Sequence, residues 1–400
     1  MKKIITLFIA VTFITAHSFA QSETEKGIEF NHNSWSDIVA QAKKENKLIF
    51  LDAYASWCGP CKWMSKNVFT NDAVAAYYNQ TFVCAKIDME KGEGVALAKK
   101  FNVKNYPTLL YIDPNETLVH RTCGVEYTSE FSATFIQNGK DALIPEKRIG
   151  GLHKAFENNY ANSENAFAYI NALDKACSPY STELKQYFDT QKESDLASAT
   201  NWMMVSNFVN DPNSREFNYL FTNRDAFAKQ HTKDSVDEKI ANVFENGLHT
   251  AIQNKNDQDY LFIKKKVQMS GIKNSEALMM KSDLDFYKSK KDWNNYSVTA
   301  SKYIDKYEIK NPQMLNSVAW TFYENVTEKR MLELAESWIK QAVELQNNYA
   351  YNDTYSAVLY KLGKKSEAEA AAEKAIELAK QENSDYKETS ELLVKIKAMK

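Results

Sequence analysis

The chain has 400 residues, of which 44% are hydrophobic and 26% are charged, so it can bury at least one full core and does not read as a disordered protein. Its formal net charge is −2, and removal of Lys2 and Lys3 would take it to −4. Because neither value gives a positive field that would recruit nucleic acid or an anionic membrane, the composition argues against nucleic-acid binding.

Residues 1–20 have the pattern of a secretory signal peptide. Two lysines precede an apolar run that ends near Ala16, and small residues stand at Ser18 and Ala20. The run is shorter than the about 20 residues that span a bilayer, which disfavours an uncleaved anchor. We therefore expect a soluble mature chain that begins near Gln21 and is exported, to the periplasm in the simplest case.

Alternating helical and strand patterns predict an α/β domain over residues 28–142. Helices are predicted where apolar residues recur on one face, and strands where short apolar runs contain β-branched and aromatic residues. A turn at 113–116 joins the last two strands as a hairpin. The expected elements are helices at 34–46, 62–69, 71–80, 94–102 and 129–139, and strands at 47–55, 81–88, 108–113 and 118–124.

Strand patterns are missing from residue 150 onward, and the sequence there predicts helices alone. Residues 150–310 show no clean period and are interpreted as irregular helical hairpins. Residues 312–380 are interpreted as tetratricopeptide-like repeats, followed by a helical tail at 381–400. A plain helical domain is the alternative for this whole region.

The repeat interpretation depends on small residues at a fixed spacing. Ala335 and Ala368 are 33 residues apart, as are Ala342 and Ala375, close to the repeat period of about 34. Small residues are needed where the two helices of a hairpin cross closely.

The sequence WCGPC at 57–61 is the motif with the clearest chemistry. It lies where a predicted strand gives way to a predicted helix. Two cysteines at this spacing form a redox pair, half of a zinc site or a static disulfide.

Zinc would require a second pair of ligands, for which His120 and Cys123 are the only candidates. Residues three apart on a strand point to opposite faces, so these two would not converge on one metal ion. A static disulfide closing so small a loop would contribute little stability. We therefore favour a redox pair and expect no metal and no cofactor.

The position of Cys58 supports redox chemistry. The free N–H groups and dipole of a helix N-terminus favour a thiolate there, and a thiolate is the attacking species. Cys61 lies one turn further along the helix, where it can attack a mixed disulfide formed at Cys58. Pro60 fixes the turn between them. Trp57 is expected to cover one flank of the site, and Lys62 to add positive potential.

Residues 47–138 resemble the thioredoxin fold, in particular the thioredoxin-like domains of exported bacterial thiol-disulfide interchange proteins. The segment FLDAYASWCGPCKWM resembles the thioredoxin active site almost throughout, and FNVKNYPTLLYID resembles the segment that holds the family's cis-proline. The resemblance implies that Asp52 handles the proton of Cys61 and that Pro107 is cis. It also implies that Tyr106 offers backbone hydrogen bonds to an extended substrate.

Two positions depart from the family pattern. Many thioredoxins have a lysine beside the buried carboxylate, whereas the position four before Asp88 is Cys84. Asp52 is therefore expected to lack a cationic partner and to have a raised pKa because of its burial. Tyr106 replaces the usual aliphatic residue or threonine, which is expected to alter substrate choice.

The remaining cysteines are not expected to form a second pair. Cys84 and Cys123 would lie about 14 Å apart across two intervening strands, whereas a disulfide needs Cα atoms within about 7 Å. Both are interpreted as apolar fillers. Cys177, outside the domain, is interpreted as a lone thiol.

Two functions remain open. The first is an exported thiol-disulfide oxidoreductase that acts on protein or peptide disulfides. Its Gly-Pro dipeptide resembles that of reducing thioredoxins, whose reduction potential is about −270 mV, and this favours a reductase or isomerase. A membrane reductase is then expected to supply the electrons. The alternative is a non-catalytic assembly protein whose helical repeats bind a partner protein while the thioredoxin unit is only a scaffold.

Overall fold

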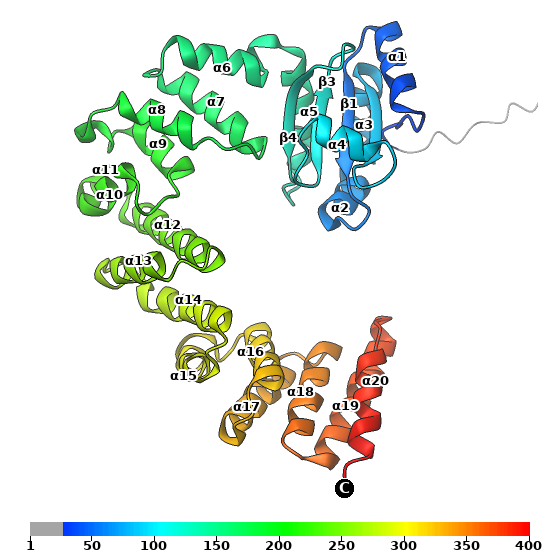
Figure 1. Cartoon of the computed structure of the whole chain (residues 1–400), viewed down its shortest axis with the longest axis vertical. Coiled ribbons are helices and arrows are strands. Elements are labelled where there is room, and N and C mark those ends of the chain that lie inside the picture. The colour runs from blue at the N-terminus through cyan, green and yellow to red at the C-terminus, as the bar shows by residue number, and fades with distance from the viewer. Residues whose placement is uncertain (1–26) are drawn as a thin grey trace, which may run out of the picture. The chain divides into compact units, whose positions relative to one another are not determined.

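The computed structural model describes residues 27–400, so the predicted signal peptide lies outside the described residues (Figure 1). The chain divides into two compact units between Thr190 and Gln191.

The first unit contains a four-stranded mixed sheet in the order β2-β1-β3-β4. β1 pairs with β2 in parallel and with β3 antiparallel, and β3 and β4 form an antiparallel hairpin. The hairpin between the last two strands is as predicted. The strands are β1 (Ile49–Tyr54), β2 (Val83–Asp88), β3 (Thr108–Ile112) and β4 (Leu118–Cys123).

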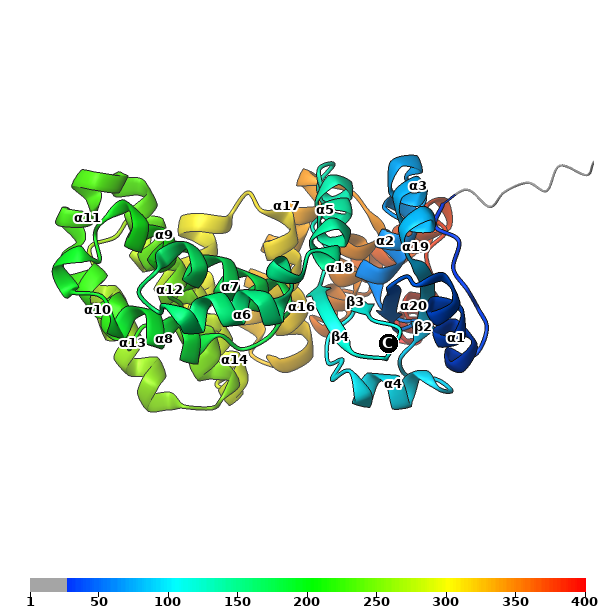
Figure 2. The ribbon, with the colours of Figure 1, turned by 90° about the horizontal axis from the view of Figure 1, so that it is seen from above.

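Helices cover both faces of this sheet, and Figure 2 shows α4 and α5 on opposite sides of it. Alternation along β1 divides the core: Ile49 and Leu51 pack with residues of α1 and α4, and Phe50 packs with residues of α2, α3 and α5. Asp52, two residues after Phe50, consequently faces the α2 side. These helices are α1 (Trp35–Glu45), α2 (Gly59–Asn67), α3 (Asp72–Thr81), α4 (Gly94–Lys100) and α5 (Phe131–Leu143).

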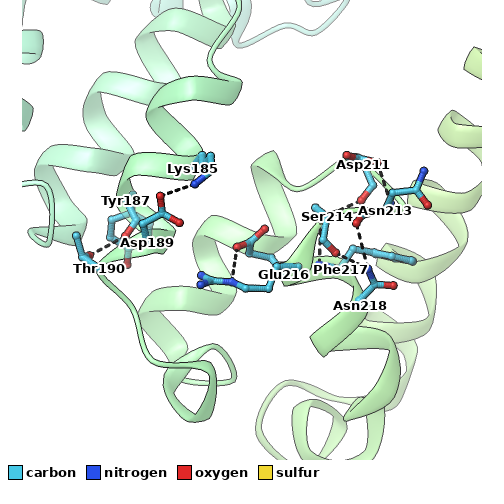
Figure 3. Close-up of polar contacts among 11 residues, drawn as sticks. Lys185, Tyr187, Asp189, Thr190, Asp211, Asn213, Ser214, Glu216, Phe217 and Asn218 are labelled. Carbon is cyan, nitrogen blue, oxygen red and sulfur yellow. Dashed lines mark hydrogen bonds and ion pairs between the residues drawn. The ribbon is translucent and has the colours of Figure 1, made fainter.

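Three further helices complete the first unit, after a short 3-10 turn η1 (Pro145–Lys147). α6 and α7 pack against the edge strand β4. In α8, an ion pair of 2.5 Å joins Lys185 and Asp189 one turn apart (Figure 3). The helices are α6 (Ile149–Asn158), α7 (Ser163–Lys175) and α8 (Ser181–Asp189).

Cys123 and Cys177 form a disulfide with a Cα–Cα distance of 5.9 Å. The interpretation of Cys123 as an apolar filler and of Cys177 as a lone thiol was therefore wrong. The sequence argument compared positions only within the sheet, whereas the α6–α7 hairpin returns to β4 and brings the turn after α7 to the end of that strand. Cys84 is the free cysteine of the described residues and is buried, as expected.

The second unit consists of helices alone among its described residues. Neighbouring helices pack in sequence as α12 with α13, α14 with α15, α16 with α17 and α18 with α19 (Figure 1). The elements are η2 (Glu193–Asp195), α9 (Ala199–Phe208), α10 (Arg215–Thr222), α11 (Arg224–His231), α12 (Lys233–Gln253), α13 (Asp257–Met269), α14 (Ser275–Lys290), α15 (Trp293–Tyr303), the π-helical turn η3 (Ile304–Glu308), α16 (Pro312–Asn325), α17 (Lys329–Leu345), α18 (Tyr349–Lys361), α19 (Lys365–Glu382) and α20 (Lys387–Lys397).

Side-chain caps set the start of many of these helices. Ser214 caps α10, since its Oγ accepts a hydrogen bond from the Phe217 N–H at 3.2 Å (Figure 3). None of the helices in residues 27–400 combines the length and apolar character needed to cross a membrane.

The alanines that suggested a repeat all lie in helix interfaces. Ala335 and Ala342 on α17, and Ala368 and Ala375 on α19, are each fully buried. A larger side chain at such a position would force the two helices of a hairpin apart.

Candidate active site

Cys58 and Cys61 lie at the junction of β1 and α2, where the sequence predicted them. Cys58 is the N-cap of α2, and its Sγ accepts a hydrogen bond from the Cys61 N–H at 3.1 Å. Pro60 occupies the first turn, where its missing N–H costs nothing. The two cysteines form a disulfide with a Cα–Cα distance of 5.3 Å, and both are at least 97% buried. A sulfur in this position would be stabilised as a thiolate after reduction, because helix N–H groups point at it.

Asp52 is 1% exposed and has a cationic partner, contrary to the sequence prediction. Lys86 stands directly opposite Asp52 in the parallel register of β1 and β2, and its Nζ lies 3.3 Å from Asp52 Oδ2. Cys84, at which the lysine was expected, pairs with Phe50 and lies two residues before Lys86 on the same face of β2. Paired residues of neighbouring strands project to the same side, so the carboxylate meets Lys86.

Lys86 connects Asp52 to the cysteine helix. Its Nζ donates a hydrogen bond to the Ser65 hydroxyl, and Ser65 Oγ donates to the Cys61 carbonyl at 2.9 Å. Sequence reasoning missed both residues. Two spacings could have indicated them. Lys86 lies two residues after Cys84 on a strand and therefore on the same face, and Ser65 lies four residues after Cys61 on a helix and therefore one turn along the same side.

Aromatic rings enclose the Lys86 ammonium. Its Nζ lies 5.0 Å from the ring centre of Tyr54, 5.1 Å from that of Phe69 and 5.7 Å from that of Phe30. The negative faces of such rings favour a cation. The arrangement holds one positive charge beneath α2.

Burial raises the pKa of Asp52 to about 6, and the attraction of Lys86 offsets only part of that rise. Neither carboxylate oxygen has a hydrogen-bond partner within the described part of the chain, apart from the ion pair with Lys86. The expected direction of the pKa shift is therefore correct, although the supposed absence of a cation is not. A carboxyl with this pKa can accept and release a proton near neutral pH.

Pro107 follows a cis peptide bond, as the resemblance implied. Pro107 is buried, and Tyr106 packs against the cluster that contains Cys58 and Cys61. Within residues 27–400, neither the N–H nor the C=O of Tyr106 has a hydrogen-bond partner. Tyr106 thus has the free backbone groups that strand addition by a substrate requires.

Trp57 forms an exposed rim beside Tyr106. Its side chain is 66% exposed, and its ring meets the Tyr106 ring edge to face at 5.9 Å. The indole N–H donates a hydrogen bond to Glu90 Oε2 at 2.8 Å, which fixes the orientation of the ring. Burial, together with the charges of Glu90 and Asp88, raises the pKa of the Tyr106 hydroxyl. The flank that Trp57 was expected to cover is therefore aromatic and acidic.

No group of three or more His, Cys, Asp or Glu side chains in the described residues is arranged to hold a metal ion. His120, the candidate zinc ligand, is buried on β4, and burial lowers its pKa to about 4. Cys123, its proposed partner, is instead in the disulfide with Cys177.

The family described as thioredoxin-like matches residues 31–114, which include Asp52, both cysteines of the site and Pro107. This part of the chain is a thioredoxin-like domain. Thioredoxin-1 of Drosophila melanogaster is 39% identical over 74 residues, covering 18% of this chain and 64% of that protein. The thiol:disulfide interchange protein DsbD of Yersinia pestis is 35% identical over 97 residues, covering 24% of this chain and 16% of DsbD.

A solution structure assigned as a disulphide isomerase from Bacteroides thetaiotaomicron is 43% identical, with a TM-score of 0.27. The match covers 30% of this chain and 95% of that one. The family match at residues 31–114 covers less than a third of the chain, and the chain spans less than two thirds of the length of these two curated relatives.

Replacing Asp52 with asparagine should stabilise the thioredoxin-like domain at neutral pH. The raised pKa means that the folded state holds the Asp52 proton more tightly than the unfolded state does, so ionisation lowers stability as the pH rises from about 4 to about 6. We expect the gain from Asp52→Asn to be about 2.4 kcal/mol larger at about pH 7.5 than at about pH 4. Denaturant titrations at both pH values measure this difference.

The matched control is Asp88→Asn, at a carboxyl near the surface that pairs with Lys91 at 3.1 Å. It removes an aspartate from the same sheet without relieving a buried charge, so it should give no comparable gain. A stability difference between the Asp52→Asn and native proteins that is the same at both pH values would show that burial does not raise the pKa of Asp52.

Proposed function

We propose that this chain is an exported thiol-disulfide oxidoreductase that reduces or isomerises disulfides in proteins or peptides. The observation that carries the proposal is the placement of Cys58 Sγ at the N-terminus of α2, within hydrogen-bond distance of the Cys61 N–H. Export is proposed from the pattern of residues 1–20, which lie outside the described chain.

In the first step, the Cys58 thiolate attacks one sulfur of a substrate disulfide. The substrate S–S bond breaks as a bond between Cys58 and the substrate forms, and the departing sulfur leaves as a thiolate that takes a proton from water. The helix N-terminus favours the charged form of Cys58 before attack.

In the second step, the Cys61 thiol gives its proton to Asp52 and the resulting thiolate attacks Cys58 Sγ. The second substrate sulfur leaves and is protonated, so the substrate gains two electrons and the chain is left with the Cys58–Cys61 disulfide. Support for Asp52 as the base comes from its burial, its pKa of about 6 and the contacts through Lys86 and Ser65.

Substrate is proposed to bind as an added strand along Tyr106 and Pro107, with Trp57 against its side chains. Each turnover as a reductase consumes two electrons, so a membrane reductase is the proposed donor that regenerates the dithiol. The helices of residues 191–400 are proposed to select the client protein.

Client trapping tests the proposal directly. A Cys61→Ala variant can make the first bond to a substrate but cannot resolve it, so mixed disulfides should accumulate on Cys58 in cells. The control is the Cys58→Ser/Cys61→Ala variant, which lacks the attacking sulfur. Equal recovery of disulfide-linked proteins from both variants would contradict the enzyme and favour the alternative, an assembly protein.

A further inference from the structure

The two disulfides of the chain lie at the same end of the sheet. Ala53, near the end of β1, pairs with Thr108 on β3, and Thr108 pairs with Cys123 on β4. Cys58 follows Ala53 by five residues, and Pro107 immediately precedes Thr108. With neighbouring strands about 4.8 Å apart, the backbone of Cys123 lies about 5 Å from that of Thr108 and about 10 Å from that of Ala53.

A hydrogen bond connects the end of β4 directly to the proline segment. The Gly124 N–H donates to the Pro107 carbonyl at 2.9 Å. The residue after Cys123 therefore holds the same segment that presents the free backbone of Tyr106.

The turn between α7 and α8 is fixed where it meets β4. Cys177 has a left-handed backbone with a φ of 50°, and its N–H donates to the Asp174 carbonyl at 2.9 Å. The next N–H, that of Ser178, donates to the Leu173 carbonyl at 2.9 Å. This end of α7 directs Cys177 to Cys123, and the side chain of Cys177 remains exposed to solvent.

We propose that the Cys123–Cys177 disulfide fixes the α7–α8 turn as a wall beside the Pro107 segment. In this position the turn contacts the residues of a substrate polypeptide that flank its disulfide. The inference rests on the proposed oxidoreductase function and adds a determinant of substrate class. An extended substrate of three residues spans about 10 Å, enough to reach from Tyr106 past the end of β4. A small disulfide has no such flanking chain, so the wall favours polypeptide substrates.

The reverse reaction, in which a dithiol reduces the Cys58–Cys61 disulfide, tests this. The fully oxidised protein is mixed with an excess of a reduced peptide that contains two cysteines, and separately with dithiothreitol. Reduction of the Cys58–Cys61 disulfide is followed by tryptophan fluorescence, and mass spectrometry verifies which disulfides remain. In Cys123→Ala/Cys177→Ala, we expect the rate constant for the peptide to fall about tenfold and that for dithiothreitol to stay within about twofold.

A second variant, Pro179→Glu, keeps the disulfide and places a negative charge on the exposed turn. The ratio of the rate constant for a lysine-flanked peptide to that for a glutamate-flanked peptide should be several-fold higher than in the native protein. The rate constant for dithiothreitol should not change. Cys84→Ala is the matched control for loss of a cysteine elsewhere and should leave the rate constants for peptide and dithiothreitol unchanged.

The inference is overturned if neither Cys123→Ala/Cys177→Ala nor Pro179→Glu changes the rate constant for the peptide. It is also overturned if the double variant loses rate equally with peptide and with dithiothreitol and Pro179→Glu does not change the preference between the two peptides. It is also overturned if disulfide mapping finds no bond between Cys123 and Cys177. A native protein that reacts with neither reagent would instead overturn the proposed oxidoreductase function, on which the inference depends.

Discussion

Replacing Cys58 with serine should lower the rate of disulfide reduction by at least about a thousandfold, because the attacking thiolate is removed and a serine hydroxyl does not ionise at neutral pH. The helix N-terminus stabilises a charge on Cys58 Sγ, and no other sulfur of the described chain has that position. Reduction of fluorescently labelled insulin by stoichiometrically reduced protein measures the effect.

Cys84→Ala provides the matched control for this experiment. Cys84 is a buried free thiol, and burial raises its pKa to about 12, so it carries no thiolate near neutral pH. Its replacement should leave the rate of insulin reduction within about twofold of the native value. If Cys58→Ser reduced insulin as fast as the native protein does, the assignment of Cys58 as nucleophile would fail.

Loss of the Cys123–Cys177 disulfide should destabilise the first unit by about 4 kcal/mol. The two cysteines are 54 residues apart, so their bond restricts a long loop in the unfolded chain. The experiment uses a Cys58→Ser/Cys61→Ser background, in which Cys123–Cys177 is the one disulfide of the described residues. Hydrogen exchange of peptides from β4 and α7 is then compared with and without Cys123→Ala/Cys177→Ala.

Local exchange is the appropriate measurement because the chain has two units and a single unfolding transition cannot be assumed. Peptides from α18 and α19 in the second unit serve as internal controls and should exchange equally in both proteins. Unchanged exchange in β4 and α7 would mean that the disulfide contributes no stability to the first unit.

The site features that the sequence predicted correctly lie within short contiguous segments. Cys58 and Cys61 are recognisable because a strand pattern stops and a helix pattern starts around them. The cis bond before Pro107 was predicted from the resemblance of FNVKNYPTLLYID to the family's cis-proline segment. Local periodicity predicts the junction at the cysteines, and a contiguous family motif predicts the proline, so neither requires knowledge of the tertiary structure.

The features that the sequence did not predict depend on register and on tertiary packing. Lys86 meets Asp52 because β1 and β2 pair in one particular register, and a register offset of two residues selected Cys84 instead. The Cys123–Cys177 bond depends on the path of α6 and α7 back to β4. No local pattern near Cys177 indicates where that path ends.

The packing around the sheet also bears on the tendency of the chain to aggregate. α6 and α7 lie against the edge strand β4, and a bridge between Asn31 and Ala85 occupies part of the opposite edge on β2. Unpaired strand edges are the sites where sheets of separate molecules join and aggregate. The segments that cover all or part of these edges precede β1 and follow α5, so elements outside the sheet protect the thioredoxin-like domain from edge-to-edge association.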